Sequence, residues 1–266
     1  MKYMVLLCLL ISFASCTPIK AAIAMNKSTE HFIPLKQDSR VLYEKGSEEF
    51  AAQISKQLDA GIQDVERGQY SHFSKPVTVY VCNTVESFTS YCLQRKAAGC
   101  VANERLFLSP ISNQKDRNVL THELSHLHLE QQLGMLDWHS GSPAWLQEGL
   151  AVLVSNDEGA KKVSRVRASQ AIATGRTFRP NTSGSLIFKK TAHSFNLDPY
   201  MFYKQAGMFV GFLREVDEEK FKIFILGLAA GQAFEPAFVG AYHQPIDVLW
   251  GEFVQFHKQL EQKRHT

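Results

Sequence analysis

The sequence has few of the features that mark several common classes of protein. It contains five cysteines in 266 residues and no Cys-x-x-Cys pair, so the spacing of a typical structural zinc site is absent. Its formal net charge is only +3, which argues against a nucleic-acid-binding protein. There is no repeat, no low-complexity segment and, beyond the first residues, no apolar run long enough to span a bilayer. With 45% hydrophobic and 21% charged residues, the composition is that of an ordinary globular protein.

The N-terminus has the pattern of an export signal. Met1-Lys2-Tyr3 carries one positive charge and precedes the apolar run Met4–Phe13, which has the length of a signal peptide rather than of a membrane span. Ala14-Ser15 directly before Cys16 resembles a bacterial lipobox, which implies cleavage before Cys16 and a lipid on that residue. Cleavage after Ala22-Ile23-Ala24 is the alternative, and it would give a periplasmic or secreted protein.

These patterns predict a signal peptide over residues 1–15 and a polar tether over residues 16–37. We expect an exported protein, anchored by lipid on Cys16 to a bacterial membrane, with Thr17 favouring the outer membrane. In an oxidising compartment, the odd number of remaining cysteines allows one disulfide and one thiol. Cys92 and Cys100 flank a short loop and are the expected pair, and Cys82, at the end of an apolar run, is the expected buried thiol.

The stretch His122-Glu123-Leu124-Ser125-His126 has the pattern of a metal-binding helix. Leucines at helical spacing predict a helix over Val119–Leu133, and Gly134 is expected to end it. Residues four apart lie on one face of a helix, so His122 and His126 can bind one metal ion together. Glu123 then stands beside the open position of the metal, where its carboxylate can take a proton from water. His128 points away from this face and is expected to be a surface or packing histidine.

Glu148 is the expected third ligand, because catalytic zinc sites usually have three protein ligands. Ser142 followed by Pro143 is typical of a helix start, with Ser142 as the cap and Pro143 at the first helical position. The apolar residues that follow place Glu148 on a second buried helix, where a carboxylate needs a partner such as Zn²⁺. Gly149 is expected to let this helix approach the metal-binding helix closely. A surface glutamate on an amphipathic helix is the alternative.

His-Glu-x-x-His followed by Trp145-Leu146-Gln147-Glu148-Gly149-Leu150-Ala151 resembles the gluzincin zinc metallopeptidases, in particular the bacterial peptidase-MA-like family. This family is similar to the catalytic core of aminopeptidase-N-like enzymes, and the resemblance covers about Pro76 to Phe256. It implies His122, His126 and Glu148 as zinc ligands and Glu123 as the general base. The segment from Tyr203 is similar to an aminopeptidase helix whose tyrosine contacts the transition state, which implies Tyr203 as oxyanion stabiliser. Packing of an aromatic-rich helix into the core is the alternative for Tyr203.

The resemblance implies an α+β, zincin-like metallopeptidase fold with a small mixed sheet and a largely helical C-terminal lobe. We expect a catalytic domain over residues 38–266, with an upper α/β lobe at about 38–133 and a lower helical lobe at about 134–266. The expected substrate is a peptide or protein. The sequence lacks a Gly-x-Met-x-Asn-like segment, which in the aminopeptidases holds the free amino end of the substrate. Endopeptidase and exopeptidase cleavage therefore both stay open, and the sequence does not indicate an oligomeric state.

Periodicity predicts the remaining elements. Helices are expected at about Ser47–Gly68, Val85–Leu93, Ala160–Thr174, Pro199–Val216, Glu218–Leu228, Phe234–Tyr242 and Ile246–Gln262. Strands are expected at Pro76–Cys82 and Val101–Ser109, and a loop at Thr177–Leu186. In zincins the strand just before the metal-binding helix is an open edge to which peptides add, and Val101–Leu108 is the expected counterpart. An ordinary sheet strand is the alternative.

Two other functions are consistent with the sequence. One is a catalytically silent binding protein of the cell envelope that keeps a zincin fold, although the retained Glu123 argues against it. The other is a zinc hydrolase of a non-peptide bond, such as an ester or an epoxide. The range of substrates would separate this enzyme from a peptidase.

Overall fold

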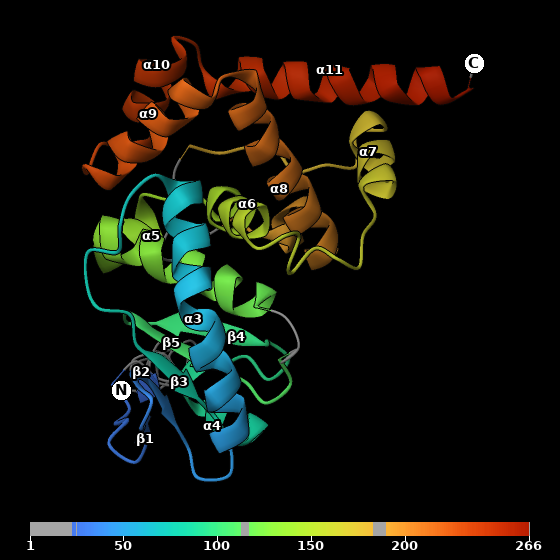
Figure 1. Ribbon diagram of the computed structural model, residues 1–266. Coiled ribbons are helices and arrows are strands. Elements are labelled where there is room, and N and C mark those ends of the chain that lie inside the picture. The colour runs from blue at the N-terminus through green and yellow to red at the C-terminus, as the bar shows by residue number, and fades with distance from the viewer. Residues whose placement is uncertain (1–22, 25, 113–116, 183–189, 266) are drawn as a thin grey trace, which may run out of the picture. The chain divides into compact units, whose positions relative to one another are not determined.

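The computed structural model describes residues 23–24, 26–112, 117–182 and 190–265 (Figure 1). The expected signal peptide, Cys16, the first part of the expected tether and residues 183–186 of the expected loop lie outside the described residues. The described residues form two compact units. Those within Met1–Lys56 and Thr78–Gln114 form unit 1, and those within Gln57–Val77 and Lys115–Thr266 form unit 2. Over the described ranges, we find no helix with the length and apolar character needed to cross a membrane.

The protein is a mixed α+β structure. Its strands are β1 (Ile33–Leu35), β2 (Asp38–Tyr43), β3 (Val79–Val81), β4 (Gly99–Ala102) and β5 (Arg105–Leu108). Its helices are α3 (Glu48–Gln69), α4 (Val85–Cys92), α5 (Asn118–Ser140), α6 (Ala144–Val154), α7 (Arg165–Ala173), the 3₁₀ helix η1 (Ala192–Phe195), α8 (Pro199–Val216), α9 (Glu218–Ala229), α10 (Phe234–Tyr242) and α11 (Ile246–His265). The expected α+β class, with a small mixed sheet and a largely helical C-terminal part, is confirmed.

Unit 1 is built on a five-stranded sheet in the order β1-β2-β3-β5-β4. The three central strands β2, β3 and β5 run parallel, and β1 and β4 are antiparallel to their neighbours. Phe32, just before β1, is buried and its ring contacts the rings of Tyr80, Tyr91 and Phe107. The folded part therefore extends into the segment that we expected to be a tether, because burial of this aromatic ring fixes the chain to the sheet.

The single strand expected at Val101–Ser109 is wrong, since the segment forms a hairpin of β4 and β5. Asn103 and Glu104, the two residues between the strands, have φ values of 54° and 56°. Left-handed backbone at both central residues is typical of a two-residue hairpin turn, and it reverses the chain. As a result β5 is paired on both sides, by β3 and β4, and cannot accept a peptide strand. Of the residues expected as the substrate-binding edge, only those in β4 lie at an end of the sheet.

The cysteines of unit 1 behave as expected. Cys92, at the end of α4, and Cys100, in β4, form a disulfide whose Cα atoms lie 6.0 Å apart. Cys82 is a free thiol with no exposed surface, and burial raises its pKa to about 12. A thiol with so high a pKa is protonated at neutral pH and therefore unreactive, in agreement with a packing role.

Side-chain caps explain why the helix boundaries of unit 2 follow the sequence. Asp198 accepts a hydrogen bond from the Tyr200 amide at the start of α8, and Asp217 accepts one from the Lys220 amide at the start of α9. The helix expected from Ala160 is shorter, because α7 begins only after Ser164, which caps the Arg167 amide. α5, which we expected in the upper lobe, belongs to unit 2, where it packs against α6.

A buried histidine ties the last helix to α7 and makes stability depend on pH. His257 of α11 is only 2% exposed, and its Nδ1 lies 2.8 Å from the Ser169 hydroxyl. Burial lowers the pKa of His257 to about 4, with a further lowering by Arg165 and Arg264 that Glu261 opposes. In the unfolded chain this imidazole takes up its proton near its usual pKa of about 6.5.

We therefore predict that the free energy of unfolding falls as the pH drops from about 6.5 to about 4, because only the unfolded chain binds the proton in this window. His257 contributes at most about 1.4 kcal/mol per pH unit to this slope. His257→Gln should unfold with a shallower dependence on pH than the native protein, as measured by urea denaturation followed by circular dichroism. The exposed His193→Gln serves as the control, and an unchanged slope in His257→Gln would contradict the prediction.

Candidate metal centre

α5 carries two of the expected ligands, His122 and His126, one turn apart on the same face. Gly134 interrupts the helix with φ 75° and ψ 158°, as expected of a glycine that ends a helix, and a second helical segment then runs to Ser140. This change of direction brings Trp138 back toward the first segment, where its ring lies 5.7 Å from the ring of His126. Trp138 therefore packs against a candidate ligand, a contact that no spacing in the sequence indicated.

α6 carries the third expected ligand, Glu148. The helix begins at Ala144 and not at Pro143, and Ser142 does not cap it, so the expected cap is wrong. Pro143 occupies the N-cap position itself, with extended backbone angles (φ −71°, ψ 149°). The start of α6 is instead fixed by Gln147, whose amide donates hydrogen bonds to the carbonyl oxygens of Trp138 (2.7 Å) and Ser142 (3.0 Å). Gln147 thus ties the ligand-bearing turn of α6 to the end of α5.

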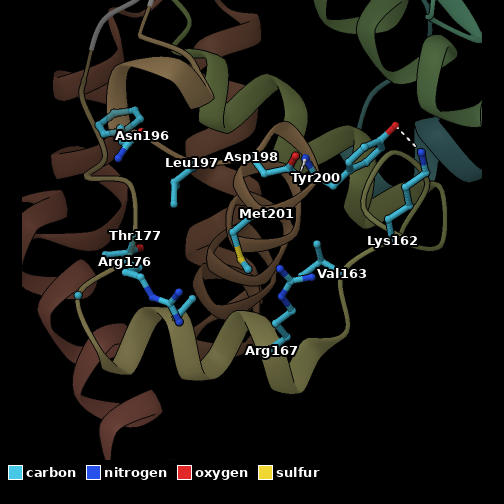
Figure 2. A pocket seen from close by; sticks show the side chains of 13 residues that line it. Lys162, Val163, Arg167, Arg176, Thr177, Asn196, Leu197, Asp198, Tyr200 and Met201 are labelled. Atoms are coloured by element: carbon cyan, nitrogen blue, oxygen red, sulfur yellow. Dashed lines mark hydrogen bonds between the residues drawn. The ribbon is translucent and has the colours of Figure 1, made fainter.

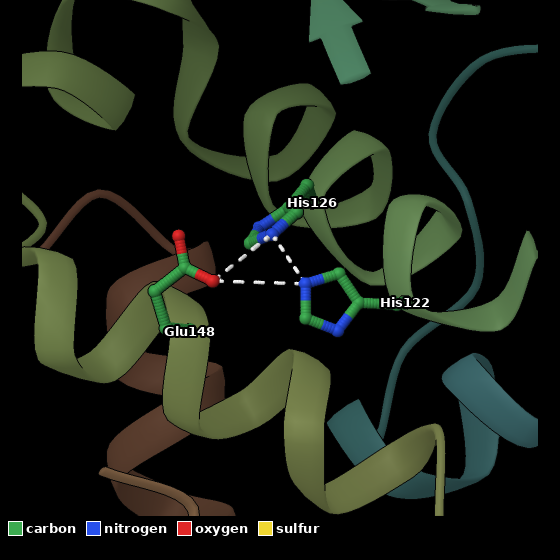
Figure 3. A group of neighbouring side chains, drawn as sticks. All are labelled: His122, His126 and Glu148. Atoms are coloured by element: carbon green, nitrogen blue, oxygen red, sulfur yellow. Dashed lines mark hydrogen bonds and ion pairs between the residues drawn. The ribbon is translucent and has the colours of Figure 1, made fainter. Parts of the chain in front are cut away.

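His122, His126 and Glu148 converge on one point (Figure 3). The Nε2 atoms of the two histidines lie 3.2 Å apart. Glu148 Oε2 lies 3.6 Å from Nε2 of His122 and 3.7 Å from Nε2 of His126. The side chains are largely buried, with 9%, 13% and 22% exposed for His122, His126 and Glu148. Three donor atoms at these separations could hold one metal ion.

Glu123 lies beside this group and is only 9% exposed. Burial raises the pKa of Glu123 to about 7; the neighbouring His122 opposes this, and the charges of Glu148 and Glu158 add to it. For His122, burial alone would lower the pKa, but the adjacent carboxylate of Glu148 and the charges of Glu123 and Glu158 raise it above its usual value. The site is therefore rich in negative charge, which a cation at the three donor atoms would compensate.

Tyr203 lies on α8, one turn from the start of the helix. Its ring is half-buried against the apolar core of unit 2, in line with the packing alternative. The negative charge of Glu148, together with burial and the charge of Glu123, raises the pKa of the Tyr203 hydroxyl well above its usual value. The tyrosine thus packs into the core and also lies within electrostatic reach of the two glutamates.

Gly149 allows a close contact between helices, as expected, but the prediction of the neighbouring helix is wrong. This glycine brings α6 against α8, not against the metal-binding helix α5. A Cβ at Gly149 would lie 2.5 Å from Val210 Cγ2 and 2.8 Å from the Ala206 carbonyl oxygen. On the facing helix, a Cβ at Gly207 would overlap the side chain of Val152. The two helices can touch only because both positions lack a side chain, and they lie side by side in Figure 1.

The loop after α6 adds residues that the sequence did not single out. Gly159, with φ +76°, lies against the site, since a Cβ there would be 3.2 Å from His122 Cε1 and 3.5 Å from Tyr203 Cδ2. The loop is held by Lys204, which is 5% exposed and whose Nζ lies 2.9 Å from Asp157 Oδ2. The only sequence signal here is a turn-forming Asn156-Asp157-Glu158-Gly159 segment, which indicates a loop but not its position.

His128 is a packing histidine, as one of the two expectations had it. It is 1% exposed, its Nδ1 donates to Oε1 of Gln69 at 2.7 Å, and its Nε2 lies 3.2 Å from the Ser71 hydroxyl. The Gln69 amide in turn donates to the Ser125 hydroxyl. These hydrogen bonds fix one face of α5, and His122 and His126 lie on another face, which forms the candidate metal centre.

Comparisons of the sequence with protein-family models and with curated proteins give no match.

We predict that Gly159→Ala lowers the affinity of the site for a metal ion by about 10–100-fold, the range found when a group that supports a ligand is lost. The new methyl group would press on the imidazole of His122 and displace it from the other two donors. Competition with a chromophoric chelator, with Zn²⁺ as the probe, measures this affinity.

Gly231→Ala is the matched control. Gly231 has φ +82° and no atom within 4 Å of the added Cβ, so it carries the same backbone strain without touching a ligand. Equal affinities for Gly159→Ala and Gly231→Ala would show that Gly159 does not position His122.

Proposed function

We propose that the protein is a zinc-dependent metallopeptidase. The observation that carries the proposal is the convergence of His122, His126 and Glu148, with Glu123 directly after the first ligand on the same helix. Two imidazoles and one carboxylate are a typical donor set for catalytic zinc, which keeps a fourth position for water or substrate. The buried carboxylate of Glu123 beside these three donors favours catalysis over simple metal storage.

The donor geometry supports zinc as the ion. With zinc–ligand distances of about 2.0–2.1 Å, the ligand atoms of a tetrahedral site lie about 3.4 Å apart. The three separations between Nε2 of His122, Nε2 of His126 and Oε2 of Glu148 are 3.2, 3.6 and 3.7 Å. Only small movements are needed to reach the tetrahedral values. Calcium and magnesium, which prefer oxygen ligands, fit this nitrogen-rich set poorly.

The chain supplies an acid–base group and a hydrogen-bond donor. Bound zinc would polarise the scissile carbonyl and make water a better nucleophile. Glu123 accepts the proton of the attacking water and passes it to the leaving amine, a task suited to a carboxylate held in a dry site. The Tyr203 hydroxyl, protonated at neutral pH, donates a hydrogen bond to the oxyanion that develops on the carbonyl. Gly159 and Gln147 keep the ligands in place.

The proposal includes the family and the location. His-Glu-x-x-His with a downstream glutamate favours a gluzincin of the peptidase-MA-like type and hence a zincin-like fold. The two ligand-bearing helices α5 and α6, joined by a short connection, are what this fold requires. For export by the N-terminal signal, and anchoring through Cys16, the support is the sequence together with the Cys92–Cys100 disulfide, which suits an oxidising compartment.

We predict that Glu123→Gln retains zinc but loses peptidase activity by about 10²–10⁴-fold, because the amide cannot accept the proton. The zinc-loaded protein, residues 17–266, is incubated with a diverse peptide mixture, and new termini are read by mass spectrometry. The exposed Glu235→Gln on α10 is the control and should cleave normally. Normal cleavage by Glu123→Gln would refute the mechanism. Absence of cleavage by the native zinc-loaded protein would favour a binding protein or a different hydrolase.

Glu148→Ala should instead weaken zinc binding itself. Loss of one of three ligands is expected to lower the affinity by more than the about 10–100-fold that follows from loss of a supporting group. Chelator competition measures the dissociation constant, and Glu123→Gln, which leaves the ligands intact, is the reference. If Glu148→Ala binds zinc as tightly as this reference, Glu148 is not a ligand.

A further inference from the structure

Unit 2 contains a pocket of about 590 Å³ next to α7 and the start of α8 (Figure 2). Its volume falls in the range of about 300–1,000 Å³ that small-ligand and side-chain pockets have. Val163, Ala171, Leu197 and Met201 give it apolar surface. We call it the basic pocket, because its polar lining includes Lys162, Arg167 and Arg176.

Positive charge dominates the lining. Lys162, Arg167 and Arg176 face a single carboxylate, that of Asp198, which is already engaged in capping α8 through the Tyr200 amide (2.9 Å). Lys162 donates a hydrogen bond to the Tyr200 hydroxyl at 2.8 Å. Arg167 and Arg176 are exposed and form no ion pair with any residue in the described parts of the chain. Their guanidinium groups are therefore available to a ligand.

The two arginines come from opposite ends of α7. Arg167 lies in its first turn and Arg176 three residues beyond its last residue, and Figure 2 draws their guanidinium groups on either side of Met201. An arginine guanidinium binds a carboxylate through two parallel hydrogen bonds, and this geometry makes arginine selective for planar anions. Met201 and the other apolar residues of the lining suit the aliphatic part of the same ligand.

The basic pocket is close to the candidate metal centre along two segments of the chain. Gly159 contacts His122, and Lys162 of the pocket follows only three residues later, a span of at most about 11 Å. On α8, Tyr203 near the metal centre and Tyr200 in the pocket are one turn apart, about 5 Å along the axis. An extended peptide advances about 3.3 Å per residue, so two to four residues cover the separation between the metal centre and the side of the pocket formed by Lys162 and Tyr200.

We propose that the basic pocket is a substrate subsite for a carboxylate two to four residues from the scissile bond. This proposal rests on the peptidase activity proposed above. The carboxylate is either the side chain of an acidic residue or the C-terminus of the peptide, which have the same charge and shape. Arg167 and Arg176 bind it, and Lys162 with Tyr200 forms the wall nearest the metal centre.

The test uses the zinc-loaded protein and peptides with one common scissile bond and blocked ends. Each peptide carries a single Glu at two, three or four residues from that bond on either side, and its twin carries Gln there. A second set has Gln only and a free C-terminus at the same distances. We expect at least one Glu peptide, or one peptide with a free C-terminus, to have a kcat/KM about tenfold above its uncharged twin, which is the lower end of the effect of a hydrogen bond to a charged group.

Arg167→Gln combined with Arg176→Gln should bring this ratio close to one, because cleavage of the charged peptide falls. Arg179→Gln is the matched control, because Arg179 is an exposed arginine just beyond Arg176 that pairs with Asp247 and does not line the pocket. Fluorescence anisotropy of labelled peptides with the inactive Glu123→Gln protein measures the dissociation constants of the two twins, and their ratio should show the same preference without cleavage. Arg167→Glu, which takes the net charge of the lining from +2 to 0, should likewise remove the preference for the carboxylate.

The outcomes separate the two proposals. Equal cleavage of charged and uncharged twins at every distance overturns the subsite and leaves the peptidase standing. A preference for the carboxylate that survives in the double variant also overturns it, since another part of the protein then reads the charge. Cleavage of no peptide by the native protein overturns the peptidase and the subsite with it.

Discussion

The close contact of α6 with α8 is the constraint on which the candidate metal centre depends. α6 carries Glu148 and α8 carries Tyr203, and the two helices meet where Gly149 and Gly207 leave no side chain between them. A methyl group at either glycine would collide with the opposite helix and push the helices apart. Metal ligands tolerate displacements of only about 0.2 Å, so a shift of this kind would take Glu148 out of reach of the histidines. An apolar contact thus sets the geometry of a polar site.

The charges of the site conflict unless a cation is present. Burial, with the charges of Glu148 and Glu158, holds the pKa of Glu123 at about 7 even though His122 lowers it. A buried carboxylate costs free energy unless a positive charge or hydrogen bond compensates it. An ion held by His122, His126 and Glu148 would supply that charge and lower the pKa of Glu123, so that more of it is ready to accept a proton. The same ion would then serve both the stability of unit 2 and its chemistry.

The sequence predicts the helical part well, because its signals are local and strong. Asp198 before a proline defines the start of α8, and the four-residue spacing of two histidines defines a shared face of α5. The sequence does not predict the structure correctly where a few backbone angles determine the course of the chain. Left-handed angles at Asn103 and Glu104, which are not glycines, turn an expected strand into a hairpin. The contact of Gly159 with His122 depends on the conformation of the loop after α6, which the periodicity of the sequence does not predict.

In the proposed peptidase, that loop would join substrate recognition to chemistry. The buried Lys204 forms an ion pair with Asp157 at 2.9 Å. Gly159, two residues after Asp157, lies against His122. Lys162, three residues after Gly159, donates a hydrogen bond to Tyr200 in the basic pocket. Since one short segment contributes to both places, a ligand that orders Lys162 also restrains the residue that positions His122. Binding energy from a remote carboxylate can in this way be used to align the reacting groups, which raises the rate and not only the affinity.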